Sequence, residues 1–331
     1  MNRILFSALL LFIHCAVQAQ PFYLPTANHA LFEKGGEERF FVPTPGHTWT
    51  SGCFGCVRSG GHQMHEGLDI KCLQRDRRGE PTDPVLATAD GTVVYMSDQP
   101  GLSNYGRYIV VRHSIDGLEV YSLYAHLSAF APGIKVGRPV RTGEPIAVMG
   151  HTGAGISRDR AHVHFELNLF YNDHFSVWFR RHYPTEHDDH GIWNGQNLVG
   201  MDPRLIFLAE REEGPNFNLL RWLQHRTELC RVLVRKADFS WLRRYPMLIR
   251  KDAAASQERV AGYEIAFDYN GLPFELIPKT ASQMKAGPKY QLLSVNDAEE
   301  TRNPCRRLVV HQGKYWELTS NGLSLLELLT D

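Results

Sequence analysis

The sequence predicts a mainly β domain followed by a C-terminal α+β domain. Between residues 61 and 170, short runs rich in Val, Ile and Tyr are separated by turns containing Gly, Asn and Asp, without a helical apolar stripe. A long helical pattern starts only near residue 216. Because 331 residues exceed the usual size of one domain, we expect two. The predicted division is a targeting segment at 1–19, an N-terminal arm at 20–60, the β-rich domain at 61–210 and the α+β domain at 215–331.

The β-rich domain contains three clear strand patterns, at residues 92–96, 107–113 and 118–127. The sequence SIDG at 114–117 has the composition of a hairpin turn between the last two. The preceding arm is rich in Pro, Gly and aromatic residues without periodicity, and we expect it to pack on the domain. The aromatic and basic segment 175–183 is compatible with a short helix. It begins an insertion that is long enough to wall one end of a groove.

The C-terminal segment combines a helical pattern with strand patterns. Leu and Val at positions 219, 220, 223, 229 and 232 predict a helix over about 216–234. Strand patterns follow at 247–250, 263–269 and 308–318, with hairpin-like turns at 269–271 and 312–314.

No catalytic constellation occurs in the C-terminal sequence, and its function is not readable from the residues; wall binding or regulation is only a guess. Its aromatic residues could contact a glycan, but their spacing is more typical of core residues. They are Trp241, Tyr263, Tyr290 and Trp316.

Residues 1–19 have the features of an export signal. Arg3 gives a basic start, and the apolar run 4–13, of about ten residues, is too short to span a bilayer. Small residues end the segment at Ala19, which makes Gln20 the expected mature start. Cys15 raises the alternative of a lipoprotein, but the histidine before it is a poor match to the small residue that such processing prefers. We expect an exported protein, periplasmic or extracellular, without a membrane span.

Charge composition excludes one class of partner. The chain has 36 basic and 36 acidic residues, so it lacks the basic footprint of a nucleic-acid-binding protein. Its 16 histidines would make it cationic at mildly acidic pH. The sequence does not specify an oligomeric state.

The first chemical motif is HVH at residues 162–164. Its neighbours favour a strand, on which His162 and His164 point to one face while Val163 points to the other. Two imidazoles about 7 Å apart suit one metal ligand and one neighbouring acid or base. The alternative interpretation is a half-buried strand with two solvated histidines.

The second motif is HEGLD at residues 65–69. It could be a variant of the helical HExxH zinc motif, with Glu66 as the base. The surrounding glycines and the lack of a helical stripe favour a loop that enters a strand instead. In that case Glu66 is solvated. Two imidazoles and one carboxylate from the two motifs form a typical catalytic zinc set with an open position.

The two motifs belong to a longer series of segments that resembles a known family. The segments are HEGLDI at 65–70, PVLATADGTV at 84–93, YAHLS at 124–128, KVG at 135–137, TGEPI at 142–146, GHTG at 150–153 and AHVHFE at 161–166. In this order they resemble the lysostaphin-type (LytM) zinc endopeptidases, which cut peptidoglycan peptides. The resemblance covers about a third of the chain. It implies a compact antiparallel β core of the duplicated-hybrid-motif type, with a groove across one sheet.

The resemblance also assigns roles to individual residues. His65, Asp69 and His164 would hold Zn²⁺, and His126 and His162 would be catalytic, flanking the bound water and the scissile amide. The implied function is hydrolysis of peptidoglycan stems or cross-links by a secreted zinc metalloendopeptidase. The alternative is a non-catalytic wall-binding or amidase-activating module on the same scaffold, but degenerate members lose metal ligands and this chain keeps them. Neither the scissile bond nor an autoinhibited state can be deduced.

One departure from the family lies before the first motif. Some members have a tyrosine a few residues upstream, whereas the segment 58–64 has none. His62 could replace it, although a solvated loop histidine is the simpler interpretation. Asn104 and Tyr105 lie in a loop that could also reach the cleft.

Histidine and acidic residues cluster a second time at 187–190. A second metal site is one interpretation of this cluster. We favour a solvated loop, because no paired ligands lie on regular structure.

Five cysteines follow the expected cleavage site: Cys53, Cys56, Cys72, Cys230 and Cys305. The oxidising environment outside the cytoplasm favours disulfide formation in an exported protein. We expect Cys72 to pair with Cys53 or Cys56, and Cys230 with Cys305, which leaves one unpaired. A redox CxxC motif and a structural zinc held by Cys53, Cys56, Cys72 and His62 are the less favoured alternatives, since no thioredoxin-like pattern surrounds the pair and thiolates oxidise outside the cytoplasm.

Overall fold

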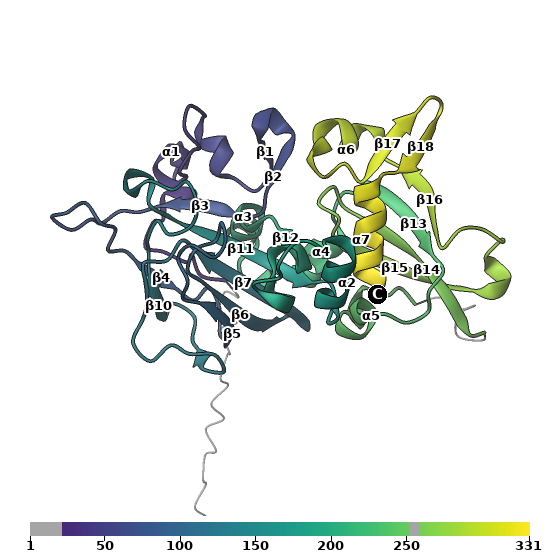
Figure 1. Ribbon diagram of the computed structural model, residues 1–331, viewed down its shortest axis with the longest axis horizontal. Coiled ribbons are helices and arrows are strands. Elements are labelled where there is room, and N and C mark those ends of the chain that lie inside the picture. Colours follow the sequence, from purple (N-terminus) through teal and green to yellow (C-terminus); the bar gives the residue numbers. More distant parts are fainter. Residues whose placement is uncertain (1–21, 252–257) are drawn as a thin grey trace, which may run out of the picture.

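The computed structural model describes residues 22–251 and 258–331 (Figure 1). The predicted export signal lies outside this part of the chain. Within the described residues, no helix is both long and apolar enough to cross a membrane. The molecule has a β-rich domain and a C-terminal unit, each built around an antiparallel sheet. Helices α2 (Phe175–His182), α5 (Ser240–Arg244) and α7 (Ser320–Thr330) lie where the two meet (Figure 1). The prediction of a mainly β domain followed by an α+β unit is therefore confirmed.

The main sheet has seven strands in the order β12-β11-β7-β6-β5-β9, with β3 also paired to β11. These strands are β3 (Leu68–Lys71), β5 (Gly91–Ser97), β6 (Tyr108–Ile115), β7 (Leu118–Ala125), β9 (Pro139–Val140), β11 (His162–Phe170) and β12 (Leu198–Met201). The three predicted strands are confirmed as β5, β6 and β7. Asp116 and Gly117 form the predicted turn, with φ of 50° and 80°, values that a type I′ hairpin requires.

Shorter strands complete the domain: β1 (Gly55–Arg58), β2 (Gln63–His65), β4 (Pro84–Leu86), β8 (Ala129–Phe130) and β10 (Pro145–Val148). Every residue of the central strand β11 is buried. The side chains of Val163, Phe165 and Leu167 join the hydrophobic core, so the alternate positions face the other side of the sheet.

The N-terminal arm packs on the β-rich domain as predicted. It contains α1 (Glu37–Phe40). Phe41 forms a bridge with Ile70 of β3, and the Val42 amide donates to the Asp69 carbonyl at 2.9 Å. The arm thereby lies directly beside the HEGLD motif.

The C-terminal unit has a four-stranded sheet in the order β15-β14-β13-β16 and a separate hairpin. The strands are β13 (Cys230–Val234), β14 (Val260–Phe267), β15 (Pro273–Thr280), β16 (Tyr290–Val295), β17 (Val309–Gln312) and β18 (Tyr315–Leu318). The remaining helices are α2 (Phe175–His182), α3 (Pro203–Glu213), α4 (Leu219–Gln224), α5 (Ser240–Arg244), α6 (Asp297–Arg302) and α7 (Ser320–Thr330). The predicted short helix near 175 is α2, and the two predicted turns connect β14 to β15 and β17 to β18.

Two secondary-structure predictions for this unit are wrong. The helix predicted over 216–234 ends at Gln224, and residues 230–234 form β13 between β14 and β16. Pairing on both edges overrides the weak helical spacing there. The segment 247–250 is a 3₁₀ turn and a single bridge, not a strand. Trp241 and Tyr263 are buried core residues as expected, with 0% and 7% exposure.

The two units share buried hydrogen bonds. The Tyr171 hydroxyl donates to the Gly271 carbonyl at 2.9 Å, and the Asn172 amide donates to the Leu328 carbonyl at 2.8 Å. From the other side, the Asn270 amide donates to the Gly200 carbonyl at 2.8 Å. Such bonds position the C-terminal unit firmly on the sheet. The predicted domain boundaries remain predictions.

The predicted disulfide pairings are wrong. Cys56 is bonded to Cys305, with the Cα atoms 5.3 Å apart, and Cys53, Cys72 and Cys230 are free. The reason is topological, because the C-terminal unit folds back so that the turn before β17 meets the β1–β2 hairpin. Cys56 is consequently not available to a structural zinc.

Candidate metal centre

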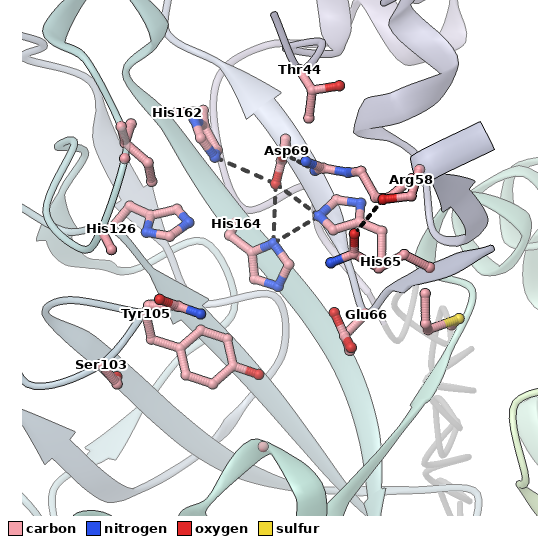
Figure 2. A pocket seen from close by; sticks show the side chains of 18 of the residues that line it. Thr44, Arg58, His65, Glu66, Asp69, Ser103, Tyr105, His126, His162 and His164 are labelled. Carbon is pink, nitrogen blue, oxygen red and sulfur yellow. Dashed lines mark hydrogen bonds and ion pairs between the residues drawn. The ribbon is translucent and has the colours of Figure 1, made fainter. Parts of the chain in front are cut away.

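Three side chains converge on one point above the sheet. His65 Nε2 lies 3.1 Å from Asp69 Oδ1, His164 Nδ1 lies 3.0 Å from the same oxygen, and the two nitrogens are 3.2 Å apart (Figure 2). All three residues are buried, with 3–6% exposure. Among the described residues, this is the one group of three His, Cys, Asp or Glu side chains found close enough to share a metal ion.

Strand pairing produces this convergence. Strand β3 runs antiparallel to β11 in a register that sets Asp69 opposite His164. His65 ends β2 just before the turn into β3. Gly67 in that turn packs against β11 so closely that a Cβ would lie 2.3 Å from the Phe165 carbonyl oxygen. Only glycine allows this approach.

The separations fit a tetrahedral zinc site. Ligand bonds of about 2.0 Å in a tetrahedron place neighbouring donor atoms about 3.3 Å apart, close to the 3.0–3.2 Å seen here. Two imidazole nitrogens and a carboxylate oxygen are also the donor types that zinc prefers. The residues therefore fit a zinc ion with one position left open.

Hydrogen bonds orient the two rings so that one nitrogen of each faces this point. His65 Nδ1 donates to the Cys53 carbonyl at 2.7 Å, so Nε2 faces Asp69. His164 Nε2 lies 2.9 Å from Glu166 Oε1, which leaves Nδ1 facing Asp69. A carboxylate behind a histidine orients the ring and increases its basicity toward a metal.

The carboxylates dominate the electrostatics of the cluster. Burial disfavours ionisation of Asp69, but His65 and His162 outweigh it and hold the pKa of Asp69 well below its usual range. Burial likewise disfavours protonation of His164, but Asp69 and Glu166 raise the pKa of His164 to about 10. Two acids around one buried ring attract positive charge, which a divalent cation supplies.

Asp69 is also held from outside the cluster. The Arg58 guanidinium donates to Asp69 Oδ2 at 2.5 Å, so one carboxylate oxygen faces the two imidazoles and the other faces the arginine (Figure 2). This contact fixes the carboxylate plane.

His126 and His162 lie beside the three converging side chains. Their ring centroids are 4.8 Å apart, and His126 lies 5.8 Å from His164 (Figure 2). His126 Nδ1 donates to the Thr152 carbonyl at 2.9 Å, and His162 Nδ1 donates to the Arg160 carbonyl at 2.7 Å. Among the described residues, His126 Nε2 has no hydrogen-bond partner, whereas His162 Nε2 lies 3.4 Å from Asp69 Oδ1 (Figure 2).

His126 has two unusual properties. Burial, assisted by His162 and His164, holds the pKa of His126 well below its usual range, so the ring is neutral at neutral pH. Its φ of 63° lies in the left-handed region, which few residues other than glycine adopt. Strain of this kind often occurs at functional sites.

The cluster lies in an open groove of about 820 Å³. The walls come from the arm, the loop that contains Asn104 and Tyr105, the segment before β11, the insertion after α2 and the C-terminal unit. The expectation that the insertion walls the groove and that Tyr105 reaches it is thus supported.

The structure brings all five predicted site residues together: His65, Asp69, His126, His162 and His164. Sequence reasoning missed Glu166 and Arg58. Strand alternation could have identified Glu166, because position 166 shares a face with His162 and His164. No local pattern distinguishes Arg58 from a surface arginine.

The histidines and acids at 187–190 do not form a metal site. His187 pairs with Asp189, Asp188 accepts from Ser176, and His190 Nδ1 lies 2.9 Å from the Tyr95 hydroxyl. His62 is exposed and lies outside the groove walls. The outcome for His62 agrees with the simpler interpretation. The cluster at 187–190 agrees in forming no metal site, but His190 is buried and lines the groove rather than lying in solvent.

The buried His-Asp-His cluster in the groove of this antiparallel β domain is a donor set of the kind that zinc peptidases use. The model of peptidase family M23 matches residues 63–175. These residues form a domain of peptidase family M23, as the resemblance to the lysostaphin-type (LytM) enzymes predicts.

Several curated proteins are similar to this domain. An uncharacterized metalloprotease of Haemophilus influenzae is 36% identical over 105 residues, which are 32% of this chain and 18% of that protein. The murein hydrolase activator NlpD of Escherichia coli is 34% identical over 131 residues, 38% of this chain and 29% of that protein. The DD-carboxypeptidase/endopeptidase Mpg of Neisseria meningitidis is 34% identical over 107 residues, 32% and 20% of the two chains. This chain spans less than a third of the length of each.

Solved structures show the same partial similarity. A zinc-containing peptidase from Vibrio cholerae is 30% identical, covers 31% of this chain and 26% of its own, and has a TM-score of 0.25. The catalytic domain of lysostaphin from Staphylococcus simulans is 29% identical, covers 35% and 74% of the two chains, and has a TM-score of 0.25.

Proposed function

We propose that this protein is an exported zinc metalloendopeptidase that hydrolyses amide bonds in peptidoglycan stems or cross-links. The observation that carries the proposal is the convergence of His65, Asp69 and His164, with donor atoms 3.0–3.2 Å apart, in the groove of a peptidase family M23 domain. Relatives named a murein hydrolase activator and a DD-carboxypeptidase/endopeptidase support peptidoglycan as the substrate.

His65, Asp69 and His164 would hold the metal. A zinc ion bound there supplies Lewis-acid polarisation of the scissile carbonyl and lowers the pKa of a water molecule to about 7. Glu166 keeps His164 Nε2 hydrogen-bonded, and Arg58 keeps Asp69 oriented. Neither residue reaches the reacting atoms, so both are positioning residues.

His126 and His162 would carry the proton transfers. Each ring donates from Nδ1 to a backbone carbonyl, so Nε2 is the nitrogen left for proton transfer, and that of His162 lies 3.4 Å from Asp69 Oδ1. A neutral Nε2 accepts the proton of the attacking water. A protonated ring stabilises the developing oxyanion or donates a proton to the leaving amine.

A second candidate function is activation of another wall hydrolase without catalysis. It is favoured by the similarity to proteins named murein hydrolase activators. The two functions predict different zinc contents for the purified protein. A hydrolase with the complete ligand set should hold one tightly bound zinc per chain, whereas an activator does not need a bound zinc. Less than one tightly bound zinc per purified chain would favour the activator.

The direct test is the variant His164→Ala, assayed for zinc content and for release of peptide fragments from purified sacculi. Loss of both is expected. His225→Ala is the matched control, because His225 is exposed in the C-terminal unit and outside the groove. Sacculus cleavage by His164→Ala at the wild-type rate would exclude this mechanism.

Mass spectrometry of products from defined muropeptides identifies which amide bond is cut.

A further inference from the structure

The C-terminal unit contributes a charged residue to the groove. Arg306, at the end of the 3₁₀ turn Pro304–Arg306, is among the residues that line it. The neighbouring residue Cys305 is bonded to Cys56 of β1, next to the HEGLD motif. The disulfide thus fixes a basic side chain of one unit beside the metal cluster of the other.

The ends of two groove arginines have no hydrogen-bond or ion-pair partner among the described residues. Arg306 donates from Nε to the Asn270 carbonyl at 3.3 Å, and Arg160 donates from Nε to the Pro43 carbonyl at 3.2 Å. In the described part of the chain, neither terminal guanidinium group makes a hydrogen bond, and neither has a carboxylate oxygen within 4.0 Å. Both side chains are half-buried. The third groove arginine, Arg58, is already paired with Asp69.

The two unpaired arginines lie on opposite sides of the cluster. Arg160 precedes β11 and stands two residues before His162. Arg306 is anchored to Asn270, which bonds to Gly200, and Gly200 is paired with Asn168 farther along β11. His164 lies between these two positions. A peptide bound across the cluster would therefore meet one arginine on each side of its scissile amide.

Negative charge in the groove walls is insufficient to neutralise these arginines. The acidic lining residues are Glu66 and Asp69, and Asp69 is already engaged by Arg58. A guanidinium group binds a carboxylate through two parallel N–H bonds, which makes a free arginine pair selective for carboxylates.

We propose that Arg160 and Arg306 are specificity residues that bind substrate carboxylates on the two sides of the scissile amide. The preferred substrate is then an anionic peptide, such as a cross-link whose diamino-acid carboxylates are free. This inference rests on the proposed function and deepens it. It also makes the C-terminal unit a wall of the substrate groove.

The test compares two cross-linked muropeptide dimers that are identical except that the diamino-acid carboxylates are free in one and amidated in the other. Binding to the zinc-loaded full-length protein is measured by calorimetry, and cleavage is measured separately. The wild type is expected to bind the free-acid dimer about tenfold more tightly. Arg306→Gln and Arg160→Gln should each weaken binding of the free acid five- to tenfold and that of the amide less than twofold. Arg306→Lys should keep part of the preference for the free-acid dimer, because lysine retains the positive charge but lacks the two parallel N–H donors of the guanidinium group.

Arg180→Gln is the matched control, because Arg180 is an exposed arginine on α2 outside the groove. Zinc content should be unchanged in every variant. The proposal is overturned if the wild type does not prefer, or does not bind, the free-acid dimer, or if the variants weaken both dimers equally or neither. Selective binding without cleavage would instead contradict the proposed hydrolase function and leave the arginine assignment intact.

Discussion

Glu166 offers the sharpest prediction about the metal centre. Its side chain is 1% exposed and makes three hydrogen bonds. Oε1 lies 2.9 Å from His164 Nε2 and accepts from the Tyr105 hydroxyl at 2.7 Å, while Oε2 accepts from the Asn168 amide at 2.8 Å. The variant Glu166→Gln keeps the shape and one acceptor oxygen but removes the charge behind His164.

The expected effect is a loss of zinc affinity. Removing such a supporting carboxylate typically costs 10- to 100-fold in metal affinity, or about 1.4–2.7 kcal/mol. Glu166→Ala should cost more, because the buried Tyr105 hydroxyl and Asn168 amide also lose their acceptor, at about 1–3 kcal/mol for each unpaired group.

Competition with a chromophoric chelator at fixed pH measures the zinc dissociation constant of each variant. Glu186→Gln serves as the control, because Glu186 is exposed and lies outside the groove. A dissociation constant for Glu166→Gln within twofold of the wild-type value would refute the idea that Glu166 supports the ligand.

Three further predictions concern stability. Cys305→Ser should lower the free energy of unfolding by about 2–4 kcal/mol in urea titrations of the oxidised protein, since the bond to Cys56 closes a loop between residues 249 positions apart; a change below 0.5 kcal/mol would contradict this. Gly67→Ala should unfold at a lower urea concentration and bind zinc more weakly than the wild type, because the added Cβ would lie 2.3 Å from the Phe165 carbonyl oxygen. A wild-type unfolding midpoint together with wild-type zinc affinity would exclude the clash. Burial raises the pKa of Glu210 to about 7, so between pH 4.5 and 7 the folded state holds a proton that the unfolded chain releases, and the free energy of unfolding falls as pH rises through that window. Glu210→Gln should therefore be more stable than the wild type at pH 8 by roughly 1–3 kcal/mol and equal to it near pH 4. A difference in stability that does not change with pH would contradict this assignment.

The local parts of the site could be predicted from sequence because strand geometry is local. Alternation along β11 places His162 and His164 on one face and Val163 on the other, and the structure agrees. The glycines near the HEGLD motif predicted a loop and strand instead of a helix, and the structure confirms this. The register that sets Asp69 opposite His164 was implied only through the family resemblance, since no spacing rule joins residues 95 positions apart.

The C-terminal unit was less predictable because its structure also depends on contacts between residues far apart in the sequence. Leu229 and Val232 fit a helical stripe, but residues 230–234 have strand neighbours on both edges, and this pairing decides their conformation. The Cys56–Cys305 bond and the position of Arg306 depend on how the two units pack. Pairing cysteines by proximity in sequence therefore failed.

Zinc K-edge X-ray absorption of the purified protein tests the central claim most directly. One zinc per chain is expected, with two imidazole nitrogens and light-atom oxygen ligands at about 2.0–2.2 Å, and this signal should be lost in His164→Ala. Sulfur scattering at about 2.3 Å would place the ion on cysteines instead. That result, or the absence of stoichiometric zinc, would contradict the assignment of His65, Asp69 and His164 as the metal centre.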